Sequence, residues 1–247
     1  GIEITINAIP VRNEDWQWTS SLNLSHNSNR VKKPSNAAYS VSYQDLAYPW
    51  IAGNTGVAVQ RLMEGSPIGQ FYTYEFAGHD ENGVSQFWVH DPVTGQRTGE
   101  KTIKPVDTDR TKTGSAQPKL TLGWNNTFSY KNWDLTLFFQ GVFGNKIFNA
   151  LRAQYNSVTL ITQGKNVFRE ALTKQNFGDV NSQSPSDRYI ENGSFLRLSS
   201  MSLSYDFGRL HGWVNNLSVY ATCNNVFTLT SYKGCDPEVS LGGLTPG

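Results

Sequence analysis

The chain has 247 residues, enough to bury a sizeable core within one all-β domain. Its 21 basic and 20 acidic side chains leave a formal net charge of +1, so it lacks the polybasic excess that attracts nucleic acid, and we expect no nucleic-acid partner. Aromatic residues make up 13% of the chain and 22 residues are glycine, a mixture typical of strands joined by turns and loops. The lack of any run of ~18 apolar residues argues against a transmembrane helix.

The start of the chain and its two cysteines bear on targeting and on disulfide bonding. Gly1 is followed directly by a strand-like pattern, without the basic, apolar and cleavage regions of a signal peptide, so we expect the interior of a longer protein. Cys223 and Cys235 are the two cysteines, and no CxxC spacing accompanies them. We expect two unpaired thiols, with a single bridge in an oxidising compartment as the alternative.

The first predicted hairpin begins at the start of the chain. Its apolar positions are Ile2, Ile4, Ile6 and Ala8 on one strand and Trp16, Trp18, Leu22 and Leu24 on the return strand. Polar residues occupy the intervening positions, and a charged turn at residues 12–15 joins the strands. This period of two predicts strands with one apolar face.

A long connection at residues 27–118 follows, and it contains strand signals of its own. Residues 67–76 and 85–96 each predict strand, with turn chemistry at residues 80–83 and at Asp91-Pro92. These segments predict extra hairpins. The run Asp80-Glu81-Asn82-Gly83 also resembles part of a calcium loop, but the other EF-hand ligand positions are missing, so we expect an Asx-type turn and no metal.

The clearest hairpin spans residues 119–143, with Lys131-Asn132 as a two-residue turn. This turn places Tyr130 opposite Trp133, Phe128 opposite Leu135, Trp124 opposite Phe139, Leu122 opposite Gly141 and Leu120 opposite Phe143. The opposite face is mostly polar, with Phe138 and Val142 as exceptions. Asn126 falls on the apolar parity, and we expect a bulge or a register change there.

A second long connection, residues 144–193, precedes the last predicted hairpin. Within it, the spacing of Phe168 and Leu172 after Gly164 predicts a short helix. The last hairpin has apolar positions at Phe195, Met201, Leu203, Tyr205 and Phe207, and then at Leu217, Val219, Ala221 and Cys223.

The links between these six strands are unequal in length. Residues 12–15, 131–132 and 208–216 are short links, and residues 27–118 and 144–193 are long ones, so up-and-down pairing puts all the short links at one end. Aromatic residues cluster beside the short links: Trp16, Trp18, Tyr130, Trp133, Tyr205, Phe207 and Trp213. Periodicity leaves two interpretations open, a membrane-interface belt or aromatic residues that cap the core of a β-sandwich.

Five stretches together resemble the SusC/RagA-type TonB-dependent transporters of the Bacteroidetes outer membrane. They are "GIEITINAIPVRNEDWQWTSSLNLSHNSNRV", "GSPIGQFYTYEFAGHDENG", "GSAQPKLTLGWNNTFSYKNWDLTLFFQGVFGNKIFN", "RYIENGSFLRLSSMSLSYDF" and "YATCNNVFTLTSYKGCDPEVS". The stretches occur in the family's order and cover nearly the whole chain. The resemblance implies that residues 1–247 are the carboxy-terminal portion of the receptor barrel, without the plug domain and the last strand.

The resemblance also implies an architecture and a set of partners. The fold would be an all-β, antiparallel, up-and-down transmembrane β-barrel, part of a 22-stranded plugged barrel with long extracellular loops, in the outer membrane of a Gram-negative cell. The TonB complex would energise it through an amino-terminal region, a SusD-like surface lipoprotein would close its mouth, and the cargo would be an oligosaccharide or a peptide. In the lipid bilayer, Leu135, Leu137, Phe139 and Phe143 would face hydrocarbon, with Asp134, Thr136 and Gln140 facing the lumen.

No catalytic signature accompanies this pattern. The four histidines, His26, His79, His90 and His211, are scattered without metal-binding or nucleophile spacing, so we expect neither an enzyme nor a cofactor. Aromatic and amide side chains in the long loops suit sugar or peptide recognition, because rings stack on apolar faces while amides satisfy polar groups. The candidate cargo-binding residues are Tyr48, Trp50, Trp88, Tyr155, Tyr232 and Asp236, with local packing as the alternative role.

Two other functions remain open at this point. The first is a soluble, secreted β-sandwich that binds carbohydrate, in which the apolar faces pack against each other across a core. The second is a passive outer-membrane porin or adhesin barrel without a plug.

Overall fold

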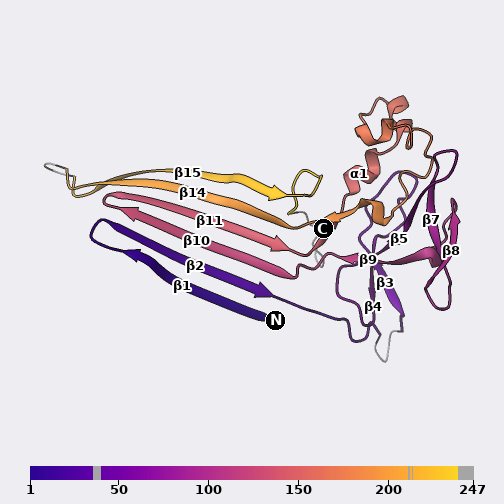
Figure 1. Cartoon of the computed structure of the whole chain (residues 1–247), viewed down its shortest axis with the longest axis horizontal. Helices are drawn as coiled ribbons and strands as arrows, with labels where there is room; N and C mark the ends of the chain where they lie inside the picture. Colours follow the sequence, from indigo (N-terminus) through magenta and orange to yellow (C-terminus); the bar gives the residue numbers. More distant parts are fainter. Residues whose placement is uncertain (36–39, 211, 213, 239–247) are drawn as a thin grey trace. The chain divides into compact units, whose positions relative to one another are not determined.

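The computed structural model describes residues 1–35, 40–210, 212 and 214–238, which divide into two units (Figure 1). Unit 1 consists of Gly1–Ser28, Pro118–Asn145 and Gly193–Ser231, and unit 2 consists of Asn29–Gln117, Lys146–Asn192 and Tyr232–Gly247. The three predicted hairpins with short links thus lie in unit 1, and most of the two long connections lies in unit 2. Trp213 and His211, named above, lie outside the described residues.

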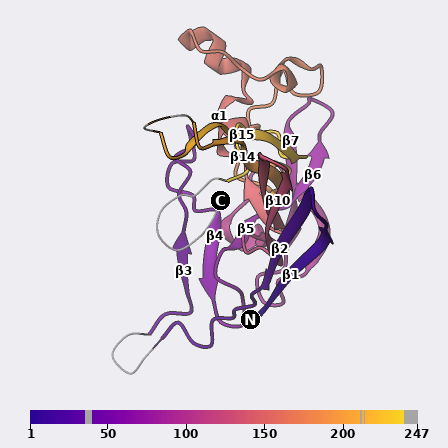
Figure 2. The same cartoon turned by 90° about the vertical axis from the view of Figure 1, so that its left-hand side faces the viewer.

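Unit 1 is a single antiparallel sheet of six long strands. In spatial order these are β1 (Ile2–Arg12), β2 (Trp16–His26), β10 (Leu120–Tyr130), β11 (Trp133–Phe143), β14 (Phe195–Gly208) and β15 (Leu217–Thr230). Neighbours in sequence are neighbours in space, as an up-and-down arrangement requires. The view along the strands shows that they follow a curved path from β1 to β15 (Figure 2), as the right-handed twist of sheets predicts.

The register of the central hairpin confirms the prediction from the sequence. Tyr130 pairs with Trp133 and Phe128 with Leu135, and the ladder continues unbroken to Leu120 and Phe143. Lys131 adopts a positive φ of 50° in the turn, which matches the twist of a two-residue hairpin. The first and last hairpins are confirmed as β1–β2 and β14–β15.

The two faces of this sheet differ chemically. On the polar face, Ser21 Oγ donates to Asn7 Oδ1 at 2.7 Å and Thr5 Oγ1 donates to Asn23 Oδ1 at 2.8 Å across β1 and β2. The apolar face is open to its surroundings: the exposed fraction is 64% at Ile2, 46% at Trp133, 42% at Leu203 and 56% at Val219. A sandwich would have buried these side chains, so the exposure opposes that interpretation.

Asn126 lies on the apolar face without the expected bulge, so that expectation was wrong. The pairing is continuous through Asn126, with Leu137 on one side and Ser20 on the other. The side chain is instead covered, since it is 2% exposed and its Oδ1 accepts a 3.1 Å hydrogen bond from Trp18 Nε1. The neighbouring Trp124 donates its Nε1 to Ser20 Oγ at 2.8 Å. The indole N–H groups of Trp18 and Trp124 therefore provide hydrogen bonds to the paired residues Asn126 and Ser20 on the apolar face.

One predicted face assignment was also wrong, because β14 contains a bulge. Phe195 was expected to share a face with Met201, yet Phe195 pairs with Val142 and Met201 pairs with Leu137, which lie on opposite faces of β11. The register shifts between Ser200 and Leu198. Because Ser199 is an extra residue in β14, the side chains before it lie on the opposite face from the one that simple alternation predicts.

Aromatic side chains form a continuous row across the short-turn end of the sheet. Trp16 pairs with Tyr130, Tyr130 with Trp133 and Trp133 with Tyr205, so one ring follows another over four strands. The ring centroids are 4.6 Å apart for Trp16–Tyr130 and for Trp133–Tyr205. A row at a single height is typical of the aromatic girdle of a membrane-spanning sheet.

Unit 2 contains short strands and turns of helix. A four-stranded antiparallel sheet contains β3 (Tyr43–Leu46), β4 (Gln60–Met63), β5 (Gln70–Tyr74) and β9 (Arg110–Ser115), and a three-stranded one contains β6 (Phe76–His79), β7 (Ser85–His90) and β8 (Arg97–Thr102). The strands β12 (Lys146–Phe148) and β13 (Ile190–Asn192) pair with each other. The helical turns are α1 (Ala150–Tyr155) and the 3-10 turns η1 (Asp107–Asp109), η2 (Val158–Gln163), η3 (Arg169–Leu172) and η4 (Asp187–Tyr189).

Unit 2 has a buried apolar core. Its members are Ile51, Val59, Phe71, Ala116, Phe148, Ala153 and Tyr189. They come from both long connections, which are far apart in the sequence. The connections are therefore folded against each other, which differs from the loose loops that their length alone suggests.

Three smaller predictions fall in these regions. The helix expected at Phe168 and Leu172 is present only as the 3-10 turn η3, and the α-helix lies before Gly164. The Asx-type turn is confirmed, because Asp80 Oδ1 accepts from the backbone N–H groups of Asn82 and Val84 at 2.9 and 2.8 Å. Both cysteines are free, as expected, and both are exposed.

Candidate cargo-binding site on unit 2

One wall of the candidate site is the short helix α1. Asn149 caps its start, since Asn149 Oδ1 accepts from the backbone N–H of Arg152 at 2.9 Å. Leu151 and Tyr155 are four residues apart and therefore lie on the same side of the helix. Ala153 points into the core of unit 2 and is 0% exposed. The core thus positions α1 and leaves Leu151 and Tyr155 facing outward.

The facing wall is the segment from Lys165 to Phe168. It begins after Gly164, which ends η2 in the left-handed region at a φ of 70°, a conformation that glycine adopts without strain. The backbone N–H of Phe168 donates to the carbonyl of Tyr155 at 3.1 Å. A main-chain hydrogen bond therefore joins the two walls at their inner edge.

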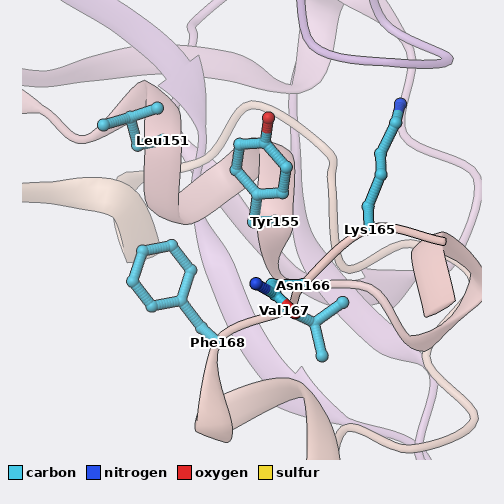
Figure 3. A pocket seen from close by; sticks show the side chains of 6 residues that line it. All are labelled: Leu151, Tyr155, Lys165, Asn166, Val167 and Phe168. Atoms are coloured by element: carbon cyan, nitrogen blue, oxygen red, sulfur yellow. The ribbon is translucent and has the colours of Figure 1, made fainter.

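Between these walls lies a cavity of about 490 Å³. Its lining residues are Leu151, Tyr155, Lys165, Asn166, Val167 and Phe168 (Figure 3). The lining is largely aliphatic and aromatic. Leu151 and Tyr155 face Phe168 across the gap, and the Lys165 side chain extends at the edge of the group (Figure 3). The volume is in the range of roughly 300–1,000 Å³ typical of small-molecule pockets.

An ion-pair network joins α1, which carries one wall, to η3, which follows the other wall. Arg152, next to Leu151, donates from Nε to Glu170 Oε2 at 2.8 Å and from Nη2 to Glu170 Oε1 at 2.9 Å. Arg188 Nη2 adds a 2.9 Å bond to the same carboxylate, and Arg152 Nη1 reaches Glu191 Oε1 at 3.1 Å. Bidentate pairing of this kind fixes orientation as well as distance.

The charge state of Glu170 follows from this arrangement. Burial alone would raise its pKa, but hydrogen bonds and charge from Arg152 and Arg188 outweigh burial and lower the pKa below the usual value. Glu170 is therefore ionised at neutral pH, and the clamp between the walls is fully formed.

Of the six predicted cargo residues, Tyr155 lines the cavity, and the segment that carries Tyr48 and Trp50 is joined to α1. Ala52 donates its backbone N–H to Gln154 Oε1 at 2.8 Å, and Ile51 shares the core with Ala153. Trp50 is 74% exposed. These aromatic residues therefore belong to elements that contact each other.

The other three residues lie elsewhere in unit 2. Trp88 lies on β7, where the guanidinium of Arg97 and the ammonium of Lys101 lie 4.6 and 4.9 Å from its ring centroid. Both cations therefore pack on that ring. Asp236 is exposed, and its Oδ1 accepts from the backbone N–H of Glu238 at 2.8 Å, as in an Asx turn.

Tyr232 lies against its own loop. A Cβ atom built on Gly234 would lie 2.3 Å from the Tyr232 ring, so only glycine leaves room for the ring. Burial, followed by the nearby charges of Glu191 and Cys235, raises the pKa of Tyr232 to about 12. The phenol thus stays neutral and is partly enclosed.

Sequence reasoning missed five of the lining residues: Leu151, Lys165, Asn166, Val167 and Phe168. The signal that would have found part of the site is the Leu151–Tyr155 spacing after an asparagine cap, which predicts a short helix with one apolar edge. Among the described residues, no cluster of His, Cys, Asp or Glu could hold a metal ion. No helix in the described part of the chain is long and apolar enough to cross a membrane.

A sheet with a hydrogen-bonded polar face, an exposed apolar face and an aromatic row at one end defines the class of outer-membrane-type β proteins. No family model matches the chain. Curated proteins do match it: TonB-dependent receptor P26 of Formosa agariphila is 30% identical over 98% of this chain, and TonB-dependent receptor SusC of Bacteroides thetaiotaomicron is 29% identical over 98%. The matched regions are 26% and 24% of those proteins, so the chain spans about a quarter of their length.

Solved structures give the same result for the fold. A structure of the RagAB peptide transporter matches with a TM-score of 0.72 and 22% identity, over 95% of this chain and 26% of that one. The RagAB peptide importer in its 'open-open' state matches with a TM-score of 0.67. The chain is thus similar to TonB-dependent receptors, SusC among them, and its fold is all-β and antiparallel, as in the RagAB structures. The relatives are named as receptors and transporters, which agrees with the non-enzymatic expectation.

Proposed function

We propose that this chain forms part of the barrel wall and the extracellular loops of a TonB-dependent active transporter, which imports oligosaccharides or peptides across the outer membrane. Residues 1–247 would be the carboxy-terminal portion of the receptor barrel. The observation that carries the proposal is the sheet of unit 1, whose exposed apolar face suits hydrocarbon and whose polar face suits a water-filled lumen. Backbone groups in hydrocarbon must all pair, so such a sheet spans a membrane only as part of a closed barrel.

The partners follow from the same proposal. A SusD-like surface lipoprotein would close the mouth formed by the long connections, and the TonB complex would act through a region outside this chain. The names of the relatives support both the TonB dependence and the import of nutrients. Mechanically, cargo bound outside must favour one of two states of the transporter, because a ligand shifts an equilibrium only by its differential affinity.

Tyr48, Trp50 and Tyr155 are the proposed cargo contacts among the residues predicted from the sequence. Their elements contact each other, and Tyr155 lines the cavity of unit 2. Trp88, Tyr232 and Asp236 are proposed as weaker, peripheral contacts.

Uptake by intact cells tests the function. Cells that express the full-length protein should accumulate a labelled peptide or oligosaccharide pool against a gradient, and accumulation should stop when the TonB gene is deleted or the proton gradient is collapsed. Uptake that persists unchanged without TonB would instead support the passive porin. Recovery of the protein without detergent in the soluble fraction would support the secreted β-sandwich.

A further inference from the structure

The cavity between α1 and Lys165–Phe168 has a lining that selects among kinds of cargo. We propose that it binds an apolar side chain of a peptide, held beside a carboxylate of the same peptide. This inference rests on the proposed function, and it names a substrate class and a subsite for it.

The apolar character of the walls favours a side chain over a sugar. Leu151, Val167 and Phe168 offer carbon surface, and the polar groups of the lining are limited to the Tyr155 hydroxyl, the Asn166 amide and the Lys165 ammonium. A sugar ring carries several hydroxyl groups, and each one that loses water in this cavity needs a new partner. An aliphatic or aromatic side chain loses no hydrogen bonds on entry, and it covers carbon surface that is open to solvent, since Leu151 is 51% and Phe168 40% exposed.

Charge complementarity selects the neighbouring group of the ligand. Lys165 is the one charged residue of the lining, and no carboxylate is among the lining residues. The nearest acid along the wall, Glu170, is engaged by Arg152 and Arg188. A cation at the rim of an apolar pocket attracts an acidic group and disfavours a basic one.

The clamp makes the cavity a preformed site. Arg152 follows Leu151 on one wall, and Glu170 lies two residues after Phe168 on the other. The bidentate bond between them, with Arg188 as a third partner, fixes the separation of the walls. Less ordering entropy is therefore lost when the ligand binds.

Direct binding tests this proposal without energised transport. The full-length protein that contains this chain, solubilised in detergent, is titrated with three fluorescent probes: a nonapeptide with a central Phe-Glu pair, the same peptide with Ser-Glu, and cellohexaose. We expect the Phe-Glu peptide to bind roughly tenfold more tightly than the Ser-Glu peptide. Equal affinity for the two peptides would overturn the proposal. So would a cellohexaose affinity above that of the Phe-Glu peptide, if the substitution Val167→Asp weakens the binding of cellohexaose.

Two substitutions locate the effect. Val167→Asp places a carboxylate in the cavity and should weaken the Phe-Glu peptide roughly tenfold, whereas the matched Val93→Asp should leave it unchanged, since Val93 is 91% exposed in a turn of another sheet. Lys165→Glu should reduce the affinity for Phe-Glu and raise that for Phe-Lys, each by about three- to fivefold. An equal effect of V167D and V93D, or no change of charge preference in K165E, would contradict the assignment.

The binding assay also separates this proposal from the proposed function. Loss of TonB-dependent uptake, with the Phe-Glu preference intact in the solubilised protein, would contradict the transport role and leave the subsite standing. TonB-dependent uptake, with no preference between the probes in the solubilised protein, would support the transport role and contradict the subsite.

Discussion

The two units of this chain place their apolar side chains by different rules. In unit 1 the alternation along each strand decides which face of the sheet a side chain occupies, and large apolar side chains such as Ile2 and Val219 are 64% and 56% exposed. In unit 2 the apolar side chains are collected into a core, where Phe71 and Tyr189 are 0% exposed. A sheet with an exposed apolar face and a polar opposite face suits a wall between lipid and water. A compact unit with its own core suits the precise positioning of loops. Four changes test this difference.

The largest expected effect comes from the core of unit 2. Phe71→Ala removes a fully buried ring and should lower the stability of unit 2 by about 3–5 kcal/mol, from lost burial and a cavity. Protease cleavage within residues 40–117 should become rapid, while the strands of unit 1 stay protected in detergent. Phe177→Ala is the matched control, because that ring is 61% exposed. Equal protection of F71A and F177A would mean that unit 2 does not depend on this core.

The second effect concerns the medium that the sheet faces. Leu137→Arg puts a charge on the apolar face and should cost about 2–4 kcal/mol near the middle of a bilayer. Thr136→Arg, one residue away on the polar face, should cost much less. The measurement is the urea dependence of folding in lipid vesicles, followed by the gel mobility of the folded form. A similar cost at both positions would remove the distinction between a lipid face and a water face.

The sequence predicted unit 1 far better than unit 2, for a physical reason. Once the turn at Lys131 is placed, a period of two assigns every residue of β10 and β11, and each pairing of that hairpin was correct. The bulge at Ser199 was missed, although the apolar positions change parity there, from Leu196 and Leu198 to Met201 and Leu203. Asn126 was misjudged for a different reason, since its hydrogen bond comes from Trp18, which is 108 positions away.

In unit 2 the important contacts join distant segments, so local patterns carried little information. Tyr155 was named from its residue type and its loop, and it does line a cavity. Phe168 and Leu151 were missed because they lie on two different walls, whose arrangement depends on the clamp between Arg152 and Glu170, and such ion pairs leave no periodic signal. Trp88 was named on the same grounds as Tyr155, yet the structure places it under Arg97 and Lys101.

The third change tests the covered polar pair on the apolar face. Trp18→Phe removes the N–H that bonds to Asn126, and a buried amide oxygen without that partner should destabilise the sheet by about 1–3 kcal/mol. Trp16→Phe is the control, because Trp16 is 45% exposed and its ring centroid lies 4.6 Å from that of Tyr130 in the aromatic row. The same vesicle assay measures both. If W16F costs as much as W18F, the indole bond to Asn126 does not stabilise the sheet.

The smallest effect is the pH response of the clamp in unit 2. The pKa of Glu170 is lower in the folded protein than the ordinary value of 4.5, because Arg152 and Arg188 outweigh its burial. Its contribution to stability is therefore present above pH 4.5 and is lost as the pH falls through the lower folded pKa. The melting temperature of unit 2, from heating followed by proteolysis, should exceed that of Glu170→Gln at neutral pH, and the gap should close on acidification below pH 4.5. A gap that stays constant down to pH 3 would mean that the carboxylate charge of Glu170 does not hold the two walls together.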